Sequence, residues 1–221
     1  MDKIQVLDKG HVQLIDMMGD DQRVVDAARV STGSAPGAPE RDRQLIDFLM
    51  SHHHETPFEK IVFEFHVKCP IFVARQWLRH RVGSYNERSA RYRPFKEEYF
   101  IPALDTLPEA FDQADIEAYE EAMQHSFAVY NRLLDKVKNE KEHRGRIREV
   151  ARGLLGTAYY TEFFWTVNFR SLMNFLSLRT HQGAQAEIRV YADAISKLIR
   201  ERIPASWSAF EQFVLIRYER E

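Results

Sequence analysis

The chain has 221 residues, of which 44% are hydrophobic and 29% charged, and its formal net charge is −2. This composition is typical of a single globular domain, 1–221, and the charge gives no support for a nucleic-acid or membrane partner. The sequence shows no secretory signal, no apolar run long enough to span a bilayer, and one cysteine, Cys69, which excludes an intrachain disulfide. We therefore expect a cytoplasmic protein.

The first third of the chain mixes period-2 and helical patterns. Residues 60–68 alternate apolar and polar side chains, which predicts a half-buried strand, and Pro70 is suited to the first position of a helix. The glycine- and proline-rich residues 31–39 predict a loop rather than a domain boundary. The predicted elements are a strand pair around Gly10 at 4–18, helices at 21–30 and 41–53, the strand at 60–68 and a helix from Pro70 to about Arg79.

The rest of the chain is mainly helical in pattern. Residues 83–99 have no period and many polar side chains, which predicts an irregular functional loop. The elements predicted after it are helices at 114–138 and 142–155, a strand at 159–168, and helices at 171–179, 184–202 (ended by Pro204) and 207–218. Helices outnumber strands without strict alternation, so we expect an α+β domain with one mixed or antiparallel sheet flanked by helices.

Arginine is concentrated between residues 75 and 93, a segment that carries a formal charge of +5. The guanidinium group binds phosphates and carboxylates through two parallel hydrogen bonds, so the segment indicates an anion site. A solvated basic loop or a cluster of structural ion pairs would give the same composition. Arg144, Arg148 and Arg152 form a second basic stripe at i, i+4 spacing, and its pattern alone is typical of a surface face.

The segment from Arg79 to Tyr92 (RHRVGSYNERSARY) carries the most specific pattern in the chain. It resembles the signature of the flavin-dependent thymidylate synthase family, RHR-x2-S-x-N-E-x-S-x-R followed by tyrosine. The resemblance continues over nearly the whole chain, with HETPFE from His54, Gln76, VAR ending at Arg152, N-x-RSL-x-NF from Asn168, and AQ-x-EI after Arg179.

The resemblance implies a thymidylate synthase-complementing fold and a methyltransferase reaction. The enzyme would convert dUMP to dTMP with 5,10-methylenetetrahydrofolate as carbon donor, and NADPH would reduce a bound FAD that supplies the hydride. The implied assembly is a homotetramer with active sites between subunits, without nucleic-acid or membrane partners.

The resemblance also assigns roles to individual residues. Arg179 would be catalytic, because it would contact the uracil and favour ionisation at N3. The dUMP site would comprise Gln76, Arg79, Glu87, Arg88, Ser89, Ala90, Arg91, Arg152 and Arg179, with Arg91 and Arg152 at the phosphate. The FAD site would comprise Thr56, Arg79, His80, Arg81, Glu87, Asn168, Arg170 and Asn174. His54 would lie where the flavin meets the nicotinamide or folate.

Other interpretations of single residues have less support. Cys69 and Ser89 lack a neighbouring base pattern, so we interpret them as a packed thiol and a substrate-binding hydroxyl rather than nucleophiles. The run from His52 to Glu55 fails the H-E-x-x-H spacing, and we expect no metal. No G-x-G-x-x-G motif indicates a dinucleotide, so the FAD prediction depends on the family resemblance alone.

The main departure from the family pattern is Gly183, where a histidine commonly precedes the AQ pair, and the nearest histidine is His181. A degenerate family member that turns over poorly is therefore one alternative. A nucleotide- or RNA-binding module is another, although the acidic remainder of the chain argues against RNA.

Overall fold

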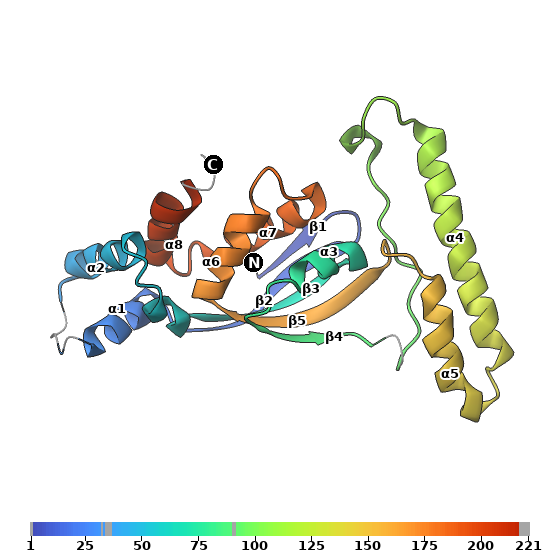
Figure 1. The fold of residues 1–221 in the computed structure, drawn as a ribbon, viewed down its shortest axis with the longest axis horizontal. Coiled ribbons are helices and arrows are strands. Elements are labelled where there is room, and N and C mark those ends of the chain that lie inside the picture. Colours follow the sequence, from blue (N-terminus) through green and yellow to red (C-terminus); the bar gives the residue numbers. More distant parts are fainter. Residues whose placement is uncertain (1, 32, 34–36, 90–91, 217–221) are drawn as a thin grey trace.

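A computed structural model describes residues 2–31, 33, 37–89 and 92–216. It is an α+β arrangement of one sheet and several helices (Figure 1). The strands are β1 (Lys3–Val6), β2 (Gly10–Met18), β3 (Val62–Pro70), β4 (Ser84–Glu87) and β5 (Tyr160–Asn168). The α-helices are α1 (Asp21–Val30), α2 (Pro39–Ser51), α3 (Ile71–Trp77), α4 (Gln113–Lys136), α5 (Lys141–Ala151), α6 (Phe169–Arg179), α7 (Ala186–Ile199) and α8 (Pro204–Phe210). Shorter turns include η1 (Thr56–Lys60), η3 (Arg152–Leu154) and a π-helical turn at Glu211–Leu215.

The five strands form a sheet in the order β1-β2-β3-β5-β4, and each neighbouring pair is antiparallel. The predicted α+β class is confirmed, and the sheet is antiparallel rather than mixed. In the central pair, Phe65 lies opposite Trp165 and Val67 opposite Phe163. Because successive side chains point to opposite faces, this register puts the large apolar residues of both strands on the same side.

The helices α3, α6 and α7 contact the strands and lie over this apolar face (Figure 1). Trp77 of α3 is the centre of the layer between sheet and helices, with its ring 5.4 Å from Phe163 and Trp165 and 4.8 Å from Phe175. All four side chains are almost fully buried. Close aromatic packing of this kind fixes the end of α3 and one face of α6, where the functional residues lie.

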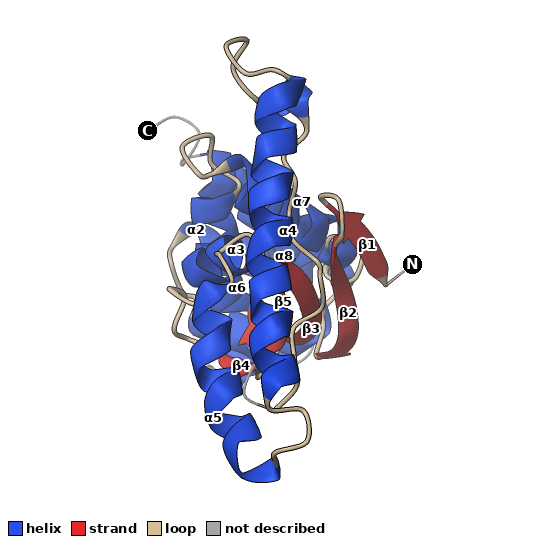
Figure 2. Ribbon diagram, turned by 90° about the vertical axis from the view of Figure 1, so that its right-hand side faces the viewer, coloured by secondary structure: helices blue, strands red, loops and turns tan. Residues whose placement is uncertain are grey.

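The helices α4 and α5 form an antiparallel hairpin at one end of the sheet (Figure 2). Its helices bury few residues, among them Phe127, Tyr130 and Ala151, which pack with Tyr99 and Tyr159 in a small separate core. Within the part of the chain that the structure describes, no helix combines the length and apolar character needed to cross a membrane.

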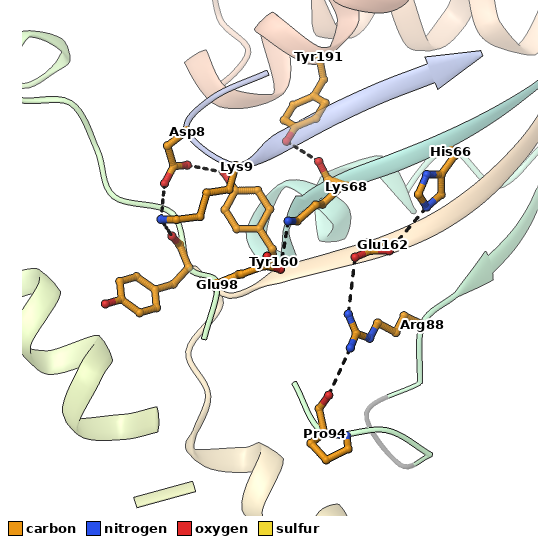
Figure 3. Close-up of polar contacts among 11 residues, drawn as sticks. Asp8, Lys9, His66, Lys68, Arg88, Pro94, Glu98, Tyr160, Glu162 and Tyr191 are labelled. Carbon is orange, nitrogen blue, oxygen red and sulfur yellow. Dashed lines mark hydrogen bonds and ion pairs between the residues drawn. The ribbon is translucent and has the colours of Figure 1, made fainter. Parts of the chain in front are cut away.

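The segment around Glu98 and Tyr99, which precedes α4, is connected to the sheet by polar contacts (Figure 3). The Lys9 ammonium group donates to the Tyr99 carbonyl at 2.9 Å, and Lys68 pairs with Glu98 at 3.0 Å. Tyr191 of α7 donates to the Lys68 carbonyl at 2.7 Å. These contacts place the segment that follows the arginine-rich region against the end of the central strands.

Several predicted elements differ from those observed, mostly at proline residues. Pro70 is the last residue of β3 and the N-cap of α3, and Pro204 begins α8 rather than ending α7, which stops at Ile199. Over the described residues the predicted helix at 207–218 is instead α8 followed by the π-helical turn, and 217–218 lie outside them. Both prolines lack an N–H group and suit a helix start, and the sequence alone did not show which neighbouring element uses them.

The prediction that residues 83–99 are irregular was wrong for β4. This strand is short, polar and at the sheet edge, so it lacks the apolar alternation by which strands are recognised. A Cβ on Gly83 would lie 2.8 Å from the Trp165 indole nitrogen, so glycine is required for the close approach of β4 to β5. The strand divides the arginine-rich segment into a part near α3 and a loop beyond β4.

Candidate active site

A cavity of about 490 Å³ lies between the end of α3 and α6, and we refer to it as the α3–α6 cavity. It is lined by Glu55, Arg79, His80, Arg81, Val82, Arg170, Ser171, Met173, Asn174, Ser177, Leu178, Arg179 and Val214. The predicted residues Arg79, His80, Arg81, Arg170, Asn174 and Arg179 are therefore brought together, although the two groups are about a hundred positions apart in the sequence. The apolar lining residues Val82, Met173, Leu178 and Val214 were missed by the sequence analysis, because single apolar residues carry no functional signal.

Arg179 is fixed at the C-terminal end of α6 by two hydrogen bonds. Its Nε–H donates to His80 Nε2 at 3.1 Å, and one terminal NH₂ group donates to the Gln76 carbonyl at 3.2 Å. Gln76 is held in turn, since its side-chain amide donates to Gln185 at 2.6 Å. The Arg179 guanidinium is thus a cation with a defined orientation in the cavity wall.

His80 is neutral at ordinary pH in this arrangement. Burial, and to a smaller extent the neighbouring Arg179 guanidinium, lowers the pKa of His80 to about 4. Because a guanidinium only donates hydrogen bonds, His80 Nε2 must be the unprotonated acceptor nitrogen. The ring also packs edge-on against Phe175 at 5.0 Å, and Tyr85 of β4 donates to the His80 carbonyl at 2.8 Å. Burial likewise lowers the pKa of Arg179, which remains a cation.

The neutral state of His80 predicts a pH dependence of stability. The pKa of His80 is 6.5 when unfolded and about 4 when folded, so between these values the unfolded chain binds more protons. The stability due to neutral His80 is complete above pH 6.5 and is lost as the pH falls toward 4. We expect on the order of 1 kcal/mol from this partly exposed group.

Urea unfolding of wild type and His80→Gln at pH 7.5, 5.5 and 4.5 measures this contribution. His11, whose pKa is lowered to about 4 mainly by burial, shifts stability in the same direction and is present in both proteins. The variant should therefore lose less stability than wild type on acidification. An equal loss in both proteins would contradict the role assigned to His80.

The N-terminus of α6 forms the opposite side of the cavity. Asn168 caps this helix, with its side-chain oxygen accepting from the Ser171 N–H at 2.8 Å. Arg170, in the first turn, pairs with Glu55 at 3.0 Å and lies 3.7 Å from Glu59. The HETPFE segment thus fixes the first turn of α6 through its two glutamates, of which Glu55 also lines the cavity.

A second hollow, of about 470 Å³, lies on the sheet near β4, and we refer to it as the sheet hollow. Its lining residues are His66, Asn86, Glu87, Arg88, Arg93, Lys96, Glu162, Phe163 and Phe164. Glu87 faces β5, where it accepts a hydrogen bond of 2.7 Å from the Thr161 hydroxyl. The structure therefore places the predicted residues Glu87 and Arg88 in a hollow other than the one containing Arg179.

The loop beyond β4 is held by contacts from distant elements. The Ser89 carbonyl accepts from the backbone N–H groups of Tyr92 and Arg93 at 3.3 and 3.4 Å. Arg148 of α5 donates to the Tyr92 carbonyl at 3.1 Å. Arg148 is half-buried and makes this contact from the surface of α5, since i, i+4 spacing shows which residues share a helix face but not what that face contacts.

The remaining predicted residues lie outside both hollows. Arg152 is exposed on η3, one helical turn beyond Arg148. Thr56 and His54 are exposed near Glu55, with His54 edge-on to Phe48 at 5.8 Å. Ala90 and Arg91 lie outside the described residues, so the phosphate contact of Arg91 stays a prediction.

Two other reactive side chains, Cys69 and His181, have structural surroundings outside the α3–α6 cavity. Cys69 is buried and burial raises its pKa, which suits a packed thiol. His181 does not line the α3–α6 cavity and accepts from the Gly183 N–H at 3.0 Å. Among the described residues, no group of three histidine, cysteine or acidic side chains is arranged to hold a metal ion.

Comparison with known proteins agrees with the sequence resemblance. Residues 13–205 match the family model described as thymidylate synthase complementing protein. The flavin-dependent thymidylate synthase of Thermosipho africanus is 47% identical, with 95% of this chain and 94% of the relative covered, and that of Thermotoga neapolitana is 48% identical, with 96% and 95% covered. The crystal structure of the UMP/dUMP methylase PolB from Streptomyces cacaoi, bound with 5-Br dUMP, superposes with a TM-score of 0.82 at 32% identity, covering 95% of this chain and 98% of that one. The chain therefore belongs to the flavin-dependent thymidylate synthase family.

Proposed function

We propose that this protein methylates dUMP to dTMP, with methylene transferred from 5,10-methylenetetrahydrofolate and reducing equivalents from NADPH through bound FAD. The observation that carries the proposal is the α3–α6 cavity. There the signature residues Arg79, His80 and Arg81 meet Asn174 and Arg179 from the second family block. The 47–48% identity to flavin-dependent thymidylate synthases, over almost the full length of each, supports the same reaction.

The residues of the cavity fit a flavin nucleotide. Arg79, Arg81 and Arg170 supply guanidinium groups for a pyrophosphate, at a helix N-terminus that also favours anions. Met173, Leu178 and Val214 supply an apolar wall suited to a flat ring system. When bound, FAD would supply the hydride that completes the methyl group.

Arg179 is the residue to which we assign the catalytic role. Its guanidinium is fixed by His80 and the Gln76 carbonyl, so it would present a fixed positive charge to a pyrimidine in the cavity. A cation beside N3 favours the anionic form of the uracil, which increases electron density at C5, the carbon that receives the methylene group. His80 is neutral, so it adds no charge of its own beside the anionic uracil.

The residues predicted to bind the nucleotide lie in separate places on one chain, which supports active sites shared between subunits of a homotetramer. Arg179 lies in the α3–α6 cavity, whereas Glu87 and Arg88 lie in the sheet hollow and Arg152 is exposed on η3. A single nucleotide that contacts Glu87, Arg152 and Arg179 is accommodated if the loop beyond β4 of one subunit meets the cavity of another. We also place the protein in the cytoplasm, as expected for nucleotide synthesis.

The test is reconstitution followed by a product assay. Protein loaded with FAD should form dTMP from dUMP when methylenetetrahydrofolate and NADPH are both present, and omission of either should stop the reaction. The folate product should be tetrahydrofolate, which is separable from dihydrofolate by chromatography. UMP in place of dUMP tests for ribonucleotide methylation. Failure to bind FAD, together with absence of dTMP, would overturn the proposal.

A further inference from the structure

Arg88 connects the two described parts of the loop beyond β4, residues 88–89 and 92–94. Its backbone N–H donates to the Glu162 carbonyl at 2.9 Å, and its side chain lies 3.6 Å from the Glu162 carboxylate. The same guanidinium donates to the Pro94 carbonyl at 3.3 Å. One side chain thus joins the start of the loop, its end and the central strand β5, as Figure 3 shows.

Glu162 is itself fixed from its other side. His66 of β3 lies 3.7 Å from the second carboxylate oxygen, and its ring packs on Phe164 with centroids 4.9 Å apart. His11 of β2 is 3.2 Å from the opposite His66 nitrogen. These residues form a polar row across the sheet face, from β2 through β3 and β5 to the loop, so the carboxylate that receives Arg88 is held by rigid strands.

The Arg88–Glu162 ion pair is too exposed to contribute much to folding stability, so its main effect is to orient the loop. The Arg88 and Glu162 side chains are 25% and 31% exposed, and ion pairs with that access to water contribute at most about 1 kcal/mol to folding. Because the Arg88 guanidinium is paired with the Glu162 carboxylate and hydrogen-bonded to the Pro94 carbonyl, it is less available to a phosphate. The loop carries Ser89 and follows Glu87, both expected at the nucleotide, so its shape decides how those residues are presented.

We propose that Arg88 is a positioning residue, which holds the nucleotide-binding loop in shape by pairing with Glu162, and not a direct ligand of dUMP. The proposal rests on the proposed function and changes one role that the family resemblance assigned. The Arg88 position is an unspecified one in the family signature, and Glu162 lies outside every matched motif.

The test compares Arg88→Ala, Glu162→Gln and the double variant in the flavin-loaded enzyme. We expect each single variant to raise KM for dUMP about fivefold, roughly 1 kcal/mol, with a smaller change in kcat. The double variant should be no worse than either single one, because both remove the same contact. The charge-exchanged pair R88E/E162R should recover part of the affinity. Arg146→Ala is the matched control, since it removes an exposed arginine–glutamate pair on α5 and should stay within twofold of wild type.

Several outcomes would overturn the assignment. If Arg88→Ala weakens dUMP binding while Glu162→Gln leaves it at the wild-type value or tighter, Arg88 contacts the nucleotide directly. Fivefold losses that multiply in the double variant, or no loss in either single variant, would also exclude the role. Calorimetric titration with dUMP accompanies the kinetics. Wild-type protein that binds dUMP without forming dTMP contradicts only the proposed function, whereas wild type that does not bind dUMP contradicts both proposals.

Discussion

Replacement of Arg179 by alanine is expected to lower kcat for dTMP formation by about 10²- to 10³-fold. This is the usual effect of removing one fixed hydrogen-bond donor that stabilises an anion as it develops in the transition state. The reason is the position of this guanidinium, which His80 and the Gln76 carbonyl orient in the α3–α6 cavity. Removal takes away a preorganised cation, and water that enters the space stabilises charge less well. The measurement is single-turnover dTMP formation, which separates chemistry from product release.

The flavin spectrum and the urea midpoint of the Arg179→Ala protein serve as controls for folding and cofactor binding. Both should resemble wild type, because Arg179 is only half-buried and lies at the end of α6. Arg179→Lys should recover a minor part of the rate, since lysine keeps the charge but cannot donate to His80 and Gln76 in the same fork geometry. A kcat within tenfold of wild type in the alanine variant would show that the catalytic assignment is wrong.

Replacement of Asn174 by tryptophan is expected to weaken FAD binding by about 100-fold or more. Asn174 is exposed on α6 and lines the α3–α6 cavity, so an indole there would occupy part of its volume of about 490 Å³. Fold stability should change little because the position is solvent-exposed, whereas a ligand that buries most of its surface cannot share the space. The dissociation constant follows from quenching of flavin fluorescence on titration of apoprotein.

Val190→Trp is the matched control for this experiment. Val190 is an exposed helical residue of α7, 41% accessible, and does not line the cavity. The control should bind FAD within about twofold of wild type. Equal FAD affinity in the Asn174→Trp protein would place the cofactor elsewhere and would remove the main support for the flavin site.

Much of the fold was predictable because the strongest patterns are local. The helix at Asp21–Val30 was predicted with the observed bounds, and β3 and β5 were each found within two residues. The apolar residues of β3 alternate as burial on one face requires, and β5 is rich in β-branched and aromatic residues. The strand β4 was not predictable in this way. Only Tyr85 of its residues reaches toward the core, and its pairing with β5 joins positions about eighty apart in sequence.

The candidate site was likewise only partly predictable from the sequence. Family resemblance named the arginine, histidine and asparagine residues that line the α3–α6 cavity, because a reaction restricts residue types at specified spacings. It assigned Arg88 to the nucleotide and left Arg148 on the surface, whereas the structure pairs Arg88 with Glu162 and directs Arg148 to the Tyr92 carbonyl. No sequence signal identifies these partners, since an exposed charge can pair with any opposite group within its reach.

The sequence by itself determined the class of the fold, the family and the cluster of functional residues around Arg79. Only the tertiary structure decided that Arg179 is oriented by a neutral His80, that β4 separates the arginine-rich segment into two parts, and that these parts face different hollows. The physical reason is that motifs and periodicity report on short-range chemistry. Burial, pKa and ion pairing depend on which distant segments the folded chain brings together.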